Sequence, residues 1–337
     1  MIAVLVSALQ QCRLFCFSGR CSVARSIVQA LVFIVVFLPQ VCFSFDWCGT
    51  SRITPGEVKT NYMIVNSRVR AYGLYVPHNL RPDSPLIIDF HGFGANRVAQ
   101  EQSSCWGELA EREGAIVVYP QGGGVVPSWD AGDYCCDTGG GNDIDFSLQL
   151  VGCLTNTNSR NKGLFVDQDR VYAAGLSNGG AMAGLLACEH SEVFSGAVVT
   201  SQSFPLQHPE QCRSVHANGT RKPAVPIIET RGTVDVIVPY GFSWGWSVPA
   251  GESLQRWGYS MGCSGEPIVE DVCDRPGSGP DCEYGKTQCK TYYDCDGGAV
   301  ASQCTLIDGH LLYKNPHDFN ICEDAWVEFE RHGLIRQ

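Results

Sequence analysis

The chain has 337 residues, of which 44% are hydrophobic and 18% charged, so it can bury a sizeable core and is not disordered. The formal net charge is −11 and no run of lysine or arginine could follow a phosphate backbone, which excludes nucleic acid as a partner. Eighteen cysteines without a C-x-x-C pair of the zinc-ribbon type indicate disulfides rather than metal ligands, and hence an oxidising compartment.

The first 44 residues have the layout of a secretory signal peptide. Three arginines and no acidic residue precede or flank an unbroken apolar run from Ala30 to Leu38, and small residues follow at Cys42 and Ser44. A run of nine is short for a membrane span, which needs about 20 apolar residues. We predict cleavage near Ser44, with a retained signal anchor, and therefore a membrane contact, as the alternative. Cleavage leaves 14 cysteines, an even number as a fully bridged secreted domain requires, and a net charge of −14.

Residues 45–337 show no linker, repeat or low-complexity tract, which predicts a single domain. Short apolar runs alternate here with segments of helical spacing, and this alternation is typical of an α/β fold with a mostly parallel sheet and helices on both faces. A stretch rich in Gly, Pro, Asp and Cys, 264–301, is expected to be a disulfide-tied insertion loop. Strands are expected at 62–76 (an antiparallel pair), 85–90, 115–119, 170–174, 196–200, 226–230 and 304–307, and helices at 104–112, 145–154 and 318–331.

A candidate nucleophile follows the expected strand at 170–174. The sequence there is Gly175-Leu-Ser177-Asn-Gly179, and a helical segment of small residues comes next. Strand, sharp turn and helix is the context of a nucleophile elbow, where flanking side chains would collide with the strand and the helix. A second G-x-S-x-G surrounds Ser243 but leads to no helix that could aim backbone amides at a substrate. The context favours Ser177 over Ser243, and over an ordinary loop serine.

A serine hydroxyl needs a base, and in sheets of this kind the acid and then the histidine follow the nucleophile in chain order. Among the later histidines, His310 directly follows an expected strand, and His317 is the alternative. Asp235 stands at another strand end, whereas Asp308 is only two residues from His310 and is badly placed to face its ring. We predict a triad of Ser177, Asp235 and His310.

An oxyanion hole is expected from two backbone amides. One belongs to Asn178, directly after the nucleophile. The other belongs to Phe93, with Gly92 as the close alternative, in the turn that follows the expected strand at 85–90. We expect His91 to hold this turn rather than to act as a second base.

Tryptophans are the direct clue to the substrate. Trp129, Trp244 and Trp246 lie near the expected site loops and could stack on a phenolic ring or a sugar, although Trp246 could instead fill the core. Asn218 begins the sequon Asn-Gly-Thr and predicts a glycosylated surface loop.

These residues resemble the secreted α/β-hydrolase esterases that include single-domain polyhydroxybutyrate depolymerases and feruloyl and acetylxylan esterases. The resemblance covers about 62–329, with two departures: Arg231 stands where a histidine commonly precedes Gly-Thr, and Leu311-Leu312 follows His310 where a Trp-containing segment is common. It implies the α/β-hydrolase fold, the triad and oxyanion turn named above, and no cofactor or metal. The matching motifs are Tyr75-Val-Pro, His91-Gly-Phe-Gly, Tyr119-Pro-Gln-Gly, Ser128-Trp-Asp, Cys135-Cys, Asp143-Ile-Asp-Phe, Arg170-Val-Tyr, Gly175-Leu-Ser-Asn-Gly-Gly, Gly232-Thr-Val-Asp and Gly309-His.

The function implied by this resemblance is that of a secreted serine carboxylic-ester hydrolase that works through an acyl-enzyme. The acidic charge of the chain suits soluble or polysaccharide-tethered esters, so we rank feruloyl-type hydrolysis of plant-wall polysaccharide esters first. Polyhydroxybutyrate depolymerisation, on a polyester, ranks second and acetyl-ester hydrolysis third. A non-catalytic relative that binds a polysaccharide or a protein is the alternative from another class, but such a relative is expected to lose a triad residue, and none is missing.

Overall fold

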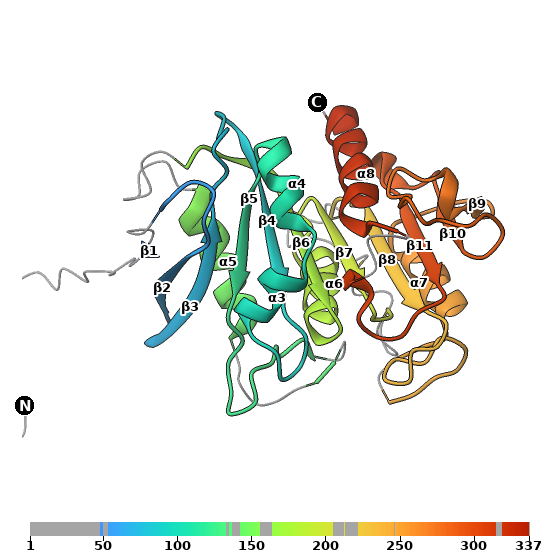
Figure 1. The fold of residues 1–337 in the computed structure, drawn as a ribbon, viewed down its shortest axis with the longest axis horizontal. Helices are drawn as coiled ribbons and strands as arrows, with labels where there is room; N and C mark the ends of the chain where they lie inside the picture. Colours follow the sequence, from blue (N-terminus) through green and yellow to red (C-terminus); the bar gives the residue numbers. More distant parts are fainter. Residues whose placement is uncertain are drawn as a thin grey trace, which may run out of the picture. The chain divides into compact units, whose positions relative to one another are not determined.

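The computed structural model describes residues 48–49, 53–132, 135–136, 142–155, 164–204, 212, 222–245, 247–314 and 319–336, all within one unit that begins at Asp46. Its strands form one 11-stranded sheet in the order β1-β2-β3-β5-β4-β6-β7-β8-β11-β10-β9 (Figure 1). They are β1 (Cys48–Gly49), β2 (Lys59–Val65), β3 (Arg68–Tyr75), β4 (Ser84–Phe90), β5 (Ile116–Pro120), β6 (Val166–Leu176), β7 (Gly196–Thr200), β8 (Ile227–Gly232), β9 (Ile268–Asp271), β10 (Gln288–Tyr292) and β11 (Ala301–Leu306). The expected leader, residues 1–44, lies outside the described residues and stays a prediction.

The six central strands, from β5 through β4, β6, β7 and β8 to β11, pair in parallel, whereas the strands on either flank pair antiparallel. All seven residues of β4 are buried. Burial on both faces explains why such strands read as continuous apolar runs. The predicted α/β fold with a mostly parallel sheet is confirmed.

Helices cover both faces of the sheet. They are α3 (Arg97–Ser103), α4 (Trp106–Glu113), α5 (Asp143–Thr155), α6 (Asn178–Glu189), α7 (Ala250–Ser260) and α8 (Ile321–Arg336). Helices α5, α6 and α7 lie on one face of the sheet, and α4 and α8 lie on the other (Figure 1). A hydrophobic core lies between the sheet and the helices on each face. Residues of β4 alternate between the two cores, since Ile87 packs in one and Leu86 and Ile88 in the other. No helix in the described ranges is long and apolar enough to span a membrane.

The cysteine-rich stretch 264–301 differs from the expected insertion loop, because it contains β9 and β10 and extends the sheet beyond β11. Cys289 of β10 faces Cys304 of β11 in register, and a disulfide joins them. Cys153 is disulfide-bonded as well. These bonds confirm that the cysteines serve as a disulfide set. The six disulfides between described residues are Cys105–Cys322, Cys135–Cys136, Cys188–Cys212, Cys263–Cys295, Cys273–Cys282 and Cys289–Cys304.

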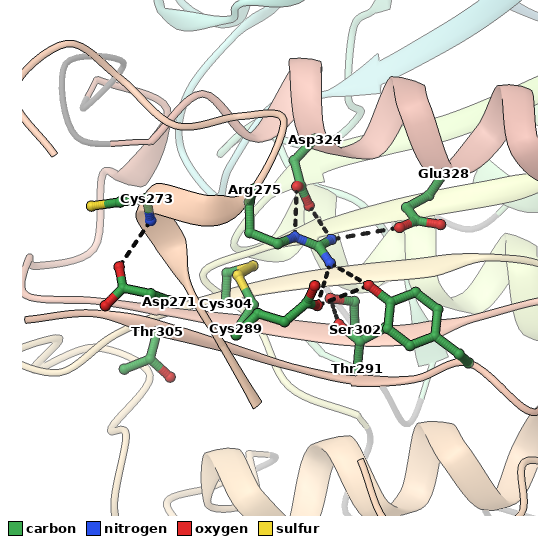
Figure 2. Close-up of a disulfide and its surroundings, with 12 residues drawn as sticks. Asp271, Cys273, Arg275, Cys289, Thr291, Ser302, Cys304, Thr305, Asp324 and Glu328 are labelled. Atoms are coloured by element: carbon green, nitrogen blue, oxygen red, sulfur yellow. Dashed lines mark hydrogen bonds and ion pairs between the residues drawn. A yellow bond between two sulfur atoms is a disulfide. The ribbon is translucent and has the colours of Figure 1, made fainter. Parts of the chain in front are cut away.

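A buried arginine ties this extension to the last helix. Figure 2 shows the Arg275 guanidinium between the strands that carry Cys289 and Cys304 and the helix that carries Asp324. Its Nε and Nη2 donate to the two carboxylate oxygens of Asp324 at 2.9 and 2.8 Å, and its Nη1 donates to Glu270 at 2.9 Å. A bidentate pair of this kind fixes orientation as well as distance. The anchor therefore holds the sheet edge next to β11, the strand that leads to His310.

Candidate active site

Ser177 stands in a strained turn between β6 and α6. Its backbone has φ 57° and ψ −119°, outside the regions that residues with a side chain readily adopt. The amide of Ser177 donates to the carbonyl of Thr200 at 2.8 Å, which ties the turn to the end of β7. A serine held this way presents its hydroxyl at the carboxyl edge of the sheet, the side on which open α/β sheets bind ligands.

Two glycines make this turn possible. A Cβ on Gly179 would lie 2.1 Å from the carbonyl oxygen of Phe90, and one on Gly175 would lie 2.3 Å from the carbonyl of Gly179. Both distances are far shorter than a van der Waals contact. The flanking glycines of the motif are therefore required by the close approach of β4, β6 and α6.

Asp235 and His310 meet directly. Nδ1 of His310 and Oδ2 of Asp235 lie 2.7 Å apart, with the carboxylate almost fully buried and the imidazole mostly so. Oδ1 of Asp235 accepts the amides of Ile237 and Val238 at 2.8 and 2.9 Å. Burial opposes the negative charge, but the hydrogen bonds from His310 and these two amides outweigh it and hold the pKa of Asp235 below its ordinary value. The contact with Asp235 uses Nδ1 and fixes the orientation of the imidazole, so Nε2 is the ring nitrogen that does not face Asp235.

The three predicted triad residues follow the carboxyl ends of β6, β8 and β11. These strands lie on the same parallel part of the sheet, so Ser177, Asp235 and His310 share one edge. Among the described residues, no hydrogen bond links the Ser177 hydroxyl to His310, whose Nδ1 is engaged by Asp235. Asp308 instead accepts the amide of Gly309 at 2.6 Å through its own side chain, and the acid that contacts His310 is Asp235.

The side chain of His91 holds the turn after β4 in place through two hydrogen bonds. This histidine is fully buried, and its Nδ1 donates to the carbonyl of Gly92 at 2.8 Å while its Nε2 accepts the amide of Gly122 at 2.9 Å. Burial lowers the pKa of His91, so the ring is neutral and serves as a brace. Among the described residues nothing accepts the amide of Phe93, and the amide of Asn178 is the first of α6 and has no partner within the helix.

The expectation that Trp129 contacts the substrate is wrong, because this side chain is completely buried. Its indole Nε1 donates to the carbonyl of His91 at 2.8 Å. Its backbone amide and carbonyl pair with the side chain of Asn178 at 2.7 and 2.9 Å. Trp129 therefore joins the turn after β4 to the first residue of α6, and so fixes both expected oxyanion donors relative to each other.

An ion pair that sequence analysis missed lies behind Trp129. Nη2 of Arg70 donates to Asp143 at 2.7 Å, and the other carboxylate oxygen of Asp143 accepts the amide of Asp130 at 2.8 Å. The guanidinium also lies over the ring of Phe146, 4.1 Å from its centroid. Residues 73 positions apart in the chain thus hold the loop that carries Trp129, and no local pattern could have predicted their contact.

A small cavity opens beside Ser177. Its volume is about 130 Å³, and its lining includes Gly92 of the expected oxyanion turn, together with Leu176 and Leu311, which directly precede Ser177 and follow His310. Ala99 of α3 and Tyr313 of the short helix η6 (Leu312–Lys314) also line it. Pockets that enclose drug-sized ligands measure about 300 to 1,000 Å³, so this one encloses a single small group.

Of the other two tryptophans predicted to contact the substrate, the structure describes Trp244 but not Trp246. Trp244, in the loop after β8, is 63% exposed and remains available to a ligand. Ser243 lies in the same exposed loop with no helix directly after it, unlike Ser177. Trp246, the sequon residue Asn218 and the alternative base His317 lie outside the described residues and stay predictions.

Asp89, the penultimate residue of β4, is a fully buried carboxyl group next to the oxyanion turn. Its Oδ1 accepts Gln100 Nε2 at 2.9 Å and the hydroxyl of Tyr313 at 3.3 Å, two side chains that also line the small cavity. Burial raises the pKa of Asp89 to about 7, although the surrounding donors counteract it.

We expect Asp89→Asn to flatten the pH dependence of stability between about pH 4 and pH 7. The folded protein keeps this proton up to about pH 7, whereas an unfolded aspartate loses it near 3.9, so rising pH destabilises the wild type across this window. Urea unfolding at pH 5 and pH 7.5 measures the effect. The wild type should lose more unfolding free energy between the two pH values than the variant, and equal losses would contradict a raised pKa.

The parallel core and the serine turn define an α/β hydrolase. A sequence model of the family described as "Esterase PHB depolymerase" matches residues 70–241, and the chain belongs to this family of carboxylic ester hydrolases. It is 28% identical over 238 residues to feruloyl esterase B from Piromyces equi, a match that covers 67% of this chain and 39% of that protein. It is also 28% identical over 169 residues to a bifunctional acetylxylan esterase/xylanase from Neocallimastix patriciarum, which covers 50% of this chain and 22% of the relative.

The chain thus matches well under half the length of these two relatives. Among solved structures, an acetyl xylan esterase from Aspergillus awamori superposes with a TM-score of 0.53 at 16% sequence identity. The superposition covers 75% of this chain and 94% of that one, and it supports the fold.

Proposed function

We propose that this protein is a serine carboxylic-ester hydrolase of the feruloyl-esterase type, which cleaves plant-wall polysaccharide esters through an acyl-enzyme. The observation that carries the proposal is the pairing of a strained serine turn with a hydrogen-bonded Asp235–His310 pair at the same sheet edge. Its feruloyl and acetylxylan esterase relatives, named for ester substrates, support this choice of substrate class.

In the acylation step, Nε2 of His310 takes the proton of the Ser177 hydroxyl while the serine oxygen attacks the ester carbonyl. Asp235, bonded to Nδ1, fixes the tautomer of His310 and stabilises the imidazolium that forms. The amides of Phe93 and Asn178 receive the negative charge that develops on the carbonyl oxygen. His310 then returns its proton to the leaving alcohol, and the acyl group remains on Ser177.

Deacylation repeats these steps with water. His310 takes a proton from the water molecule, the resulting hydroxide attacks the acyl-enzyme, and the proton returns to the Ser177 oxygen as the carboxylic acid departs. Neutral His91 takes no part in proton transfer, because both its ring nitrogens are engaged by Gly92 and Gly122.

The site geometry bears on the substrate. A cavity of about 130 Å³ is too small to enclose a feruloyl group, so its phenolic ring would lie at the open surface. Trp244 is exposed on the loop that carries Asp235 and is our candidate partner for this ring; stacking on it would contribute on the order of 1 kcal/mol beyond burial.

Polyhydroxybutyrate depolymerisation is the second candidate, and exposed apolar side chains favour it. They occur on the loops after β4, β5, β8 and β11, around the edge that carries Ser177, and a hydrophobic polyester surface could cover them. They are Phe93, Val126, Val236, Ile237, Phe242, Trp244 and Leu311, each at least 47% exposed.

We also propose that the protein acts outside the cell. Six disulfides between described residues need an oxidising compartment to form and persist. The signal-peptide layout of residues 1–44 agrees with this location.

A comparison of two esters tests the substrate. We expect kcat/KM for methyl ferulate to exceed that for a soluble hydroxybutyrate oligomer, and Trp244→Ala to raise KM for methyl ferulate while leaving that for methyl acetate, which has no aromatic ring, unchanged. The reason is that only the phenolic ring reaches the exposed indole. A preference of tenfold or more for the oligomer would reverse the ranking of the two substrates. A protein that hydrolyses none of these esters would refute the proposed esterase activity.

A further inference from the structure

Arg231, one of the two departures from the family pattern, is completely buried on β8 four residues before Asp235. Its Nη2 donates to the carbonyl of Pro239 at 2.8 Å and approaches that of Val238 at 3.4 Å. Its Nη1 lies 3.4 Å from the carbonyl of Val248. One guanidinium thus contacts two separate parts of the loop between β8 and α7, its first half and its last residues.

The charge of Arg231 is matched by a second buried residue. Glu229, two positions earlier on β8, lies 3.4 Å from Nη1 and is also completely buried. Its carboxylate accepts Ser253 Oγ at 2.6 Å, Trp257 Nε1 at 3.0 Å and Gln303 Nε2 at 3.0 Å. A buried ion pair that is this well hydrogen bonded is costly to break on one side only.

Val238 connects this pair to the active site. Its amide donates to Oδ1 of Asp235 at 2.9 Å, while its carbonyl faces the Arg231 guanidinium. The turn that stabilises the carboxylate of Asp235 is therefore held from its far side by a buried cation. We propose that Arg231 is a positioning residue that acts through Asp235 and holds this acid in register with His310. This inference rests on the proposed hydrolase function.

The shape of arginine suits this role. A planar guanidinium presents several donors in fixed directions, so it can engage the carbonyls of Val238, Pro239 and Val248 while facing Glu229. Lysine keeps the charge but offers one compact ammonium group. An exchange of Arg231 for lysine therefore separates the positioning role from the charge.

The test compares three variants with p-nitrophenyl acetate as substrate. Glu229→Gln/Arg231→Met removes the carbonyl contacts without leaving an unpaired buried charge, and Arg231→Lys keeps the charge alone. We expect both to lower kcat by about 10- to 100-fold with little change in KM, because displacement of catalytic groups by ~1 Å costs up to about 100-fold. Ser253→Ala is the matched control: it loses a hydrogen bond to Glu229, and should lower the melting temperature while kcat stays close to wild type.

A double-mutant cycle distinguishes positioning from general destabilisation. If Arg231 acts through Asp235, the Glu229→Gln/Arg231→Met exchange should change kcat less than about threefold in an Asp235→Asn background. An equal loss in both backgrounds, or a folded Arg231→Lys protein with wild-type kcat, would overturn the proposal. Failure of both Arg231 variants to fold would overturn it too, by assigning Arg231 to the fold alone. A wild type that neither hydrolyses esters nor reacts with a fluorophosphonate would instead refute the hydrolase function.

Discussion

Ser177→Ala should abolish ester hydrolysis, with kcat falling by a factor on the order of 10⁶, as expected when the nucleophile of a triad is removed. The turn itself should survive, because alanine keeps the Cβ and the amide that donates to Thr200. Loss of activity with an unchanged melting temperature therefore reports chemistry rather than unfolding. Steady-state kinetics with p-nitrophenyl acetate and labelling by a fluorophosphonate probe measure it, and the variant should not be labelled.

Ser243→Ala is the matched control for this experiment. Ser243 lies in the other G-x-S-x-G, but in an exposed loop with no helix directly after it. We expect its kcat to stay within about twofold of wild type, in line with the small effect of most surface substitutions. Comparable losses in both variants would refute the argument from the strand-to-helix turn.

Asp235→Asn should lower kcat by about 10⁴-fold, since an amide in place of the carboxylate favours the wrong tautomer of His310 and stabilises no imidazolium. The two amides of Ile237 and Val238 can still donate to the side-chain carbonyl, so the turn is expected to persist. KM should change far less than kcat, because Asp235 is almost fully buried and acts on the transition state through His310.

Asp308→Asn provides the comparison for the acid. Its side chain accepts the amide of Gly309 and not the ring of His310, and asparagine can keep that hydrogen bond. We expect activity close to wild type. A large loss here together with an active Asp235→Asn protein would assign the acid to Asp308.

The parts of the site that could be predicted are those with local signatures. Ser177 is recognisable because its glycines are required by contacts within one strand, turn and helix. The positions of Asp235 and His310 follow from chain order and from strands whose apolar runs are evident. Helix α7 and the seven-residue α3 were not predicted, the latter because its sequence Arg-Val-Ala-Gln-Glu-Gln-Ser has no apolar stripe.

The parts that could not be predicted depend on contacts between distant residues. An isolated tryptophan near a glycine-rich segment suggests a ligand platform, but Trp129 is buried because Arg70 and Asp143 hold its loop against the sheet. Strands β9 and β10 lie in a stretch without apolar periodicity and were not predicted. Disulfides and the Arg275 anchor, rather than an apolar pattern, hold them in place. In the sequence, Arg231 is recognisable only as a departure from the family pattern. Its proposed positioning role depends on contacts with the backbone carbonyls of Val238, Pro239 and Val248, which only the structure shows.

The bond between Cys105, at the start of α4, and Cys322, in α8, closes a loop with a sequence separation of 217. Ser177, Asp235 and His310 all lie within that loop. If a protease cuts one exposed segment between the two cysteines, the disulfide still joins the two pieces covalently. The hydrogen bonds between strands of the sheet can then keep the two pieces folded together. The closed loop also removes freedom from the unfolded chain, worth up to about 5 kcal/mol. An enzyme with this covalent link is expected to resist inactivation by proteases around it, since its inactivation requires more than a single cut.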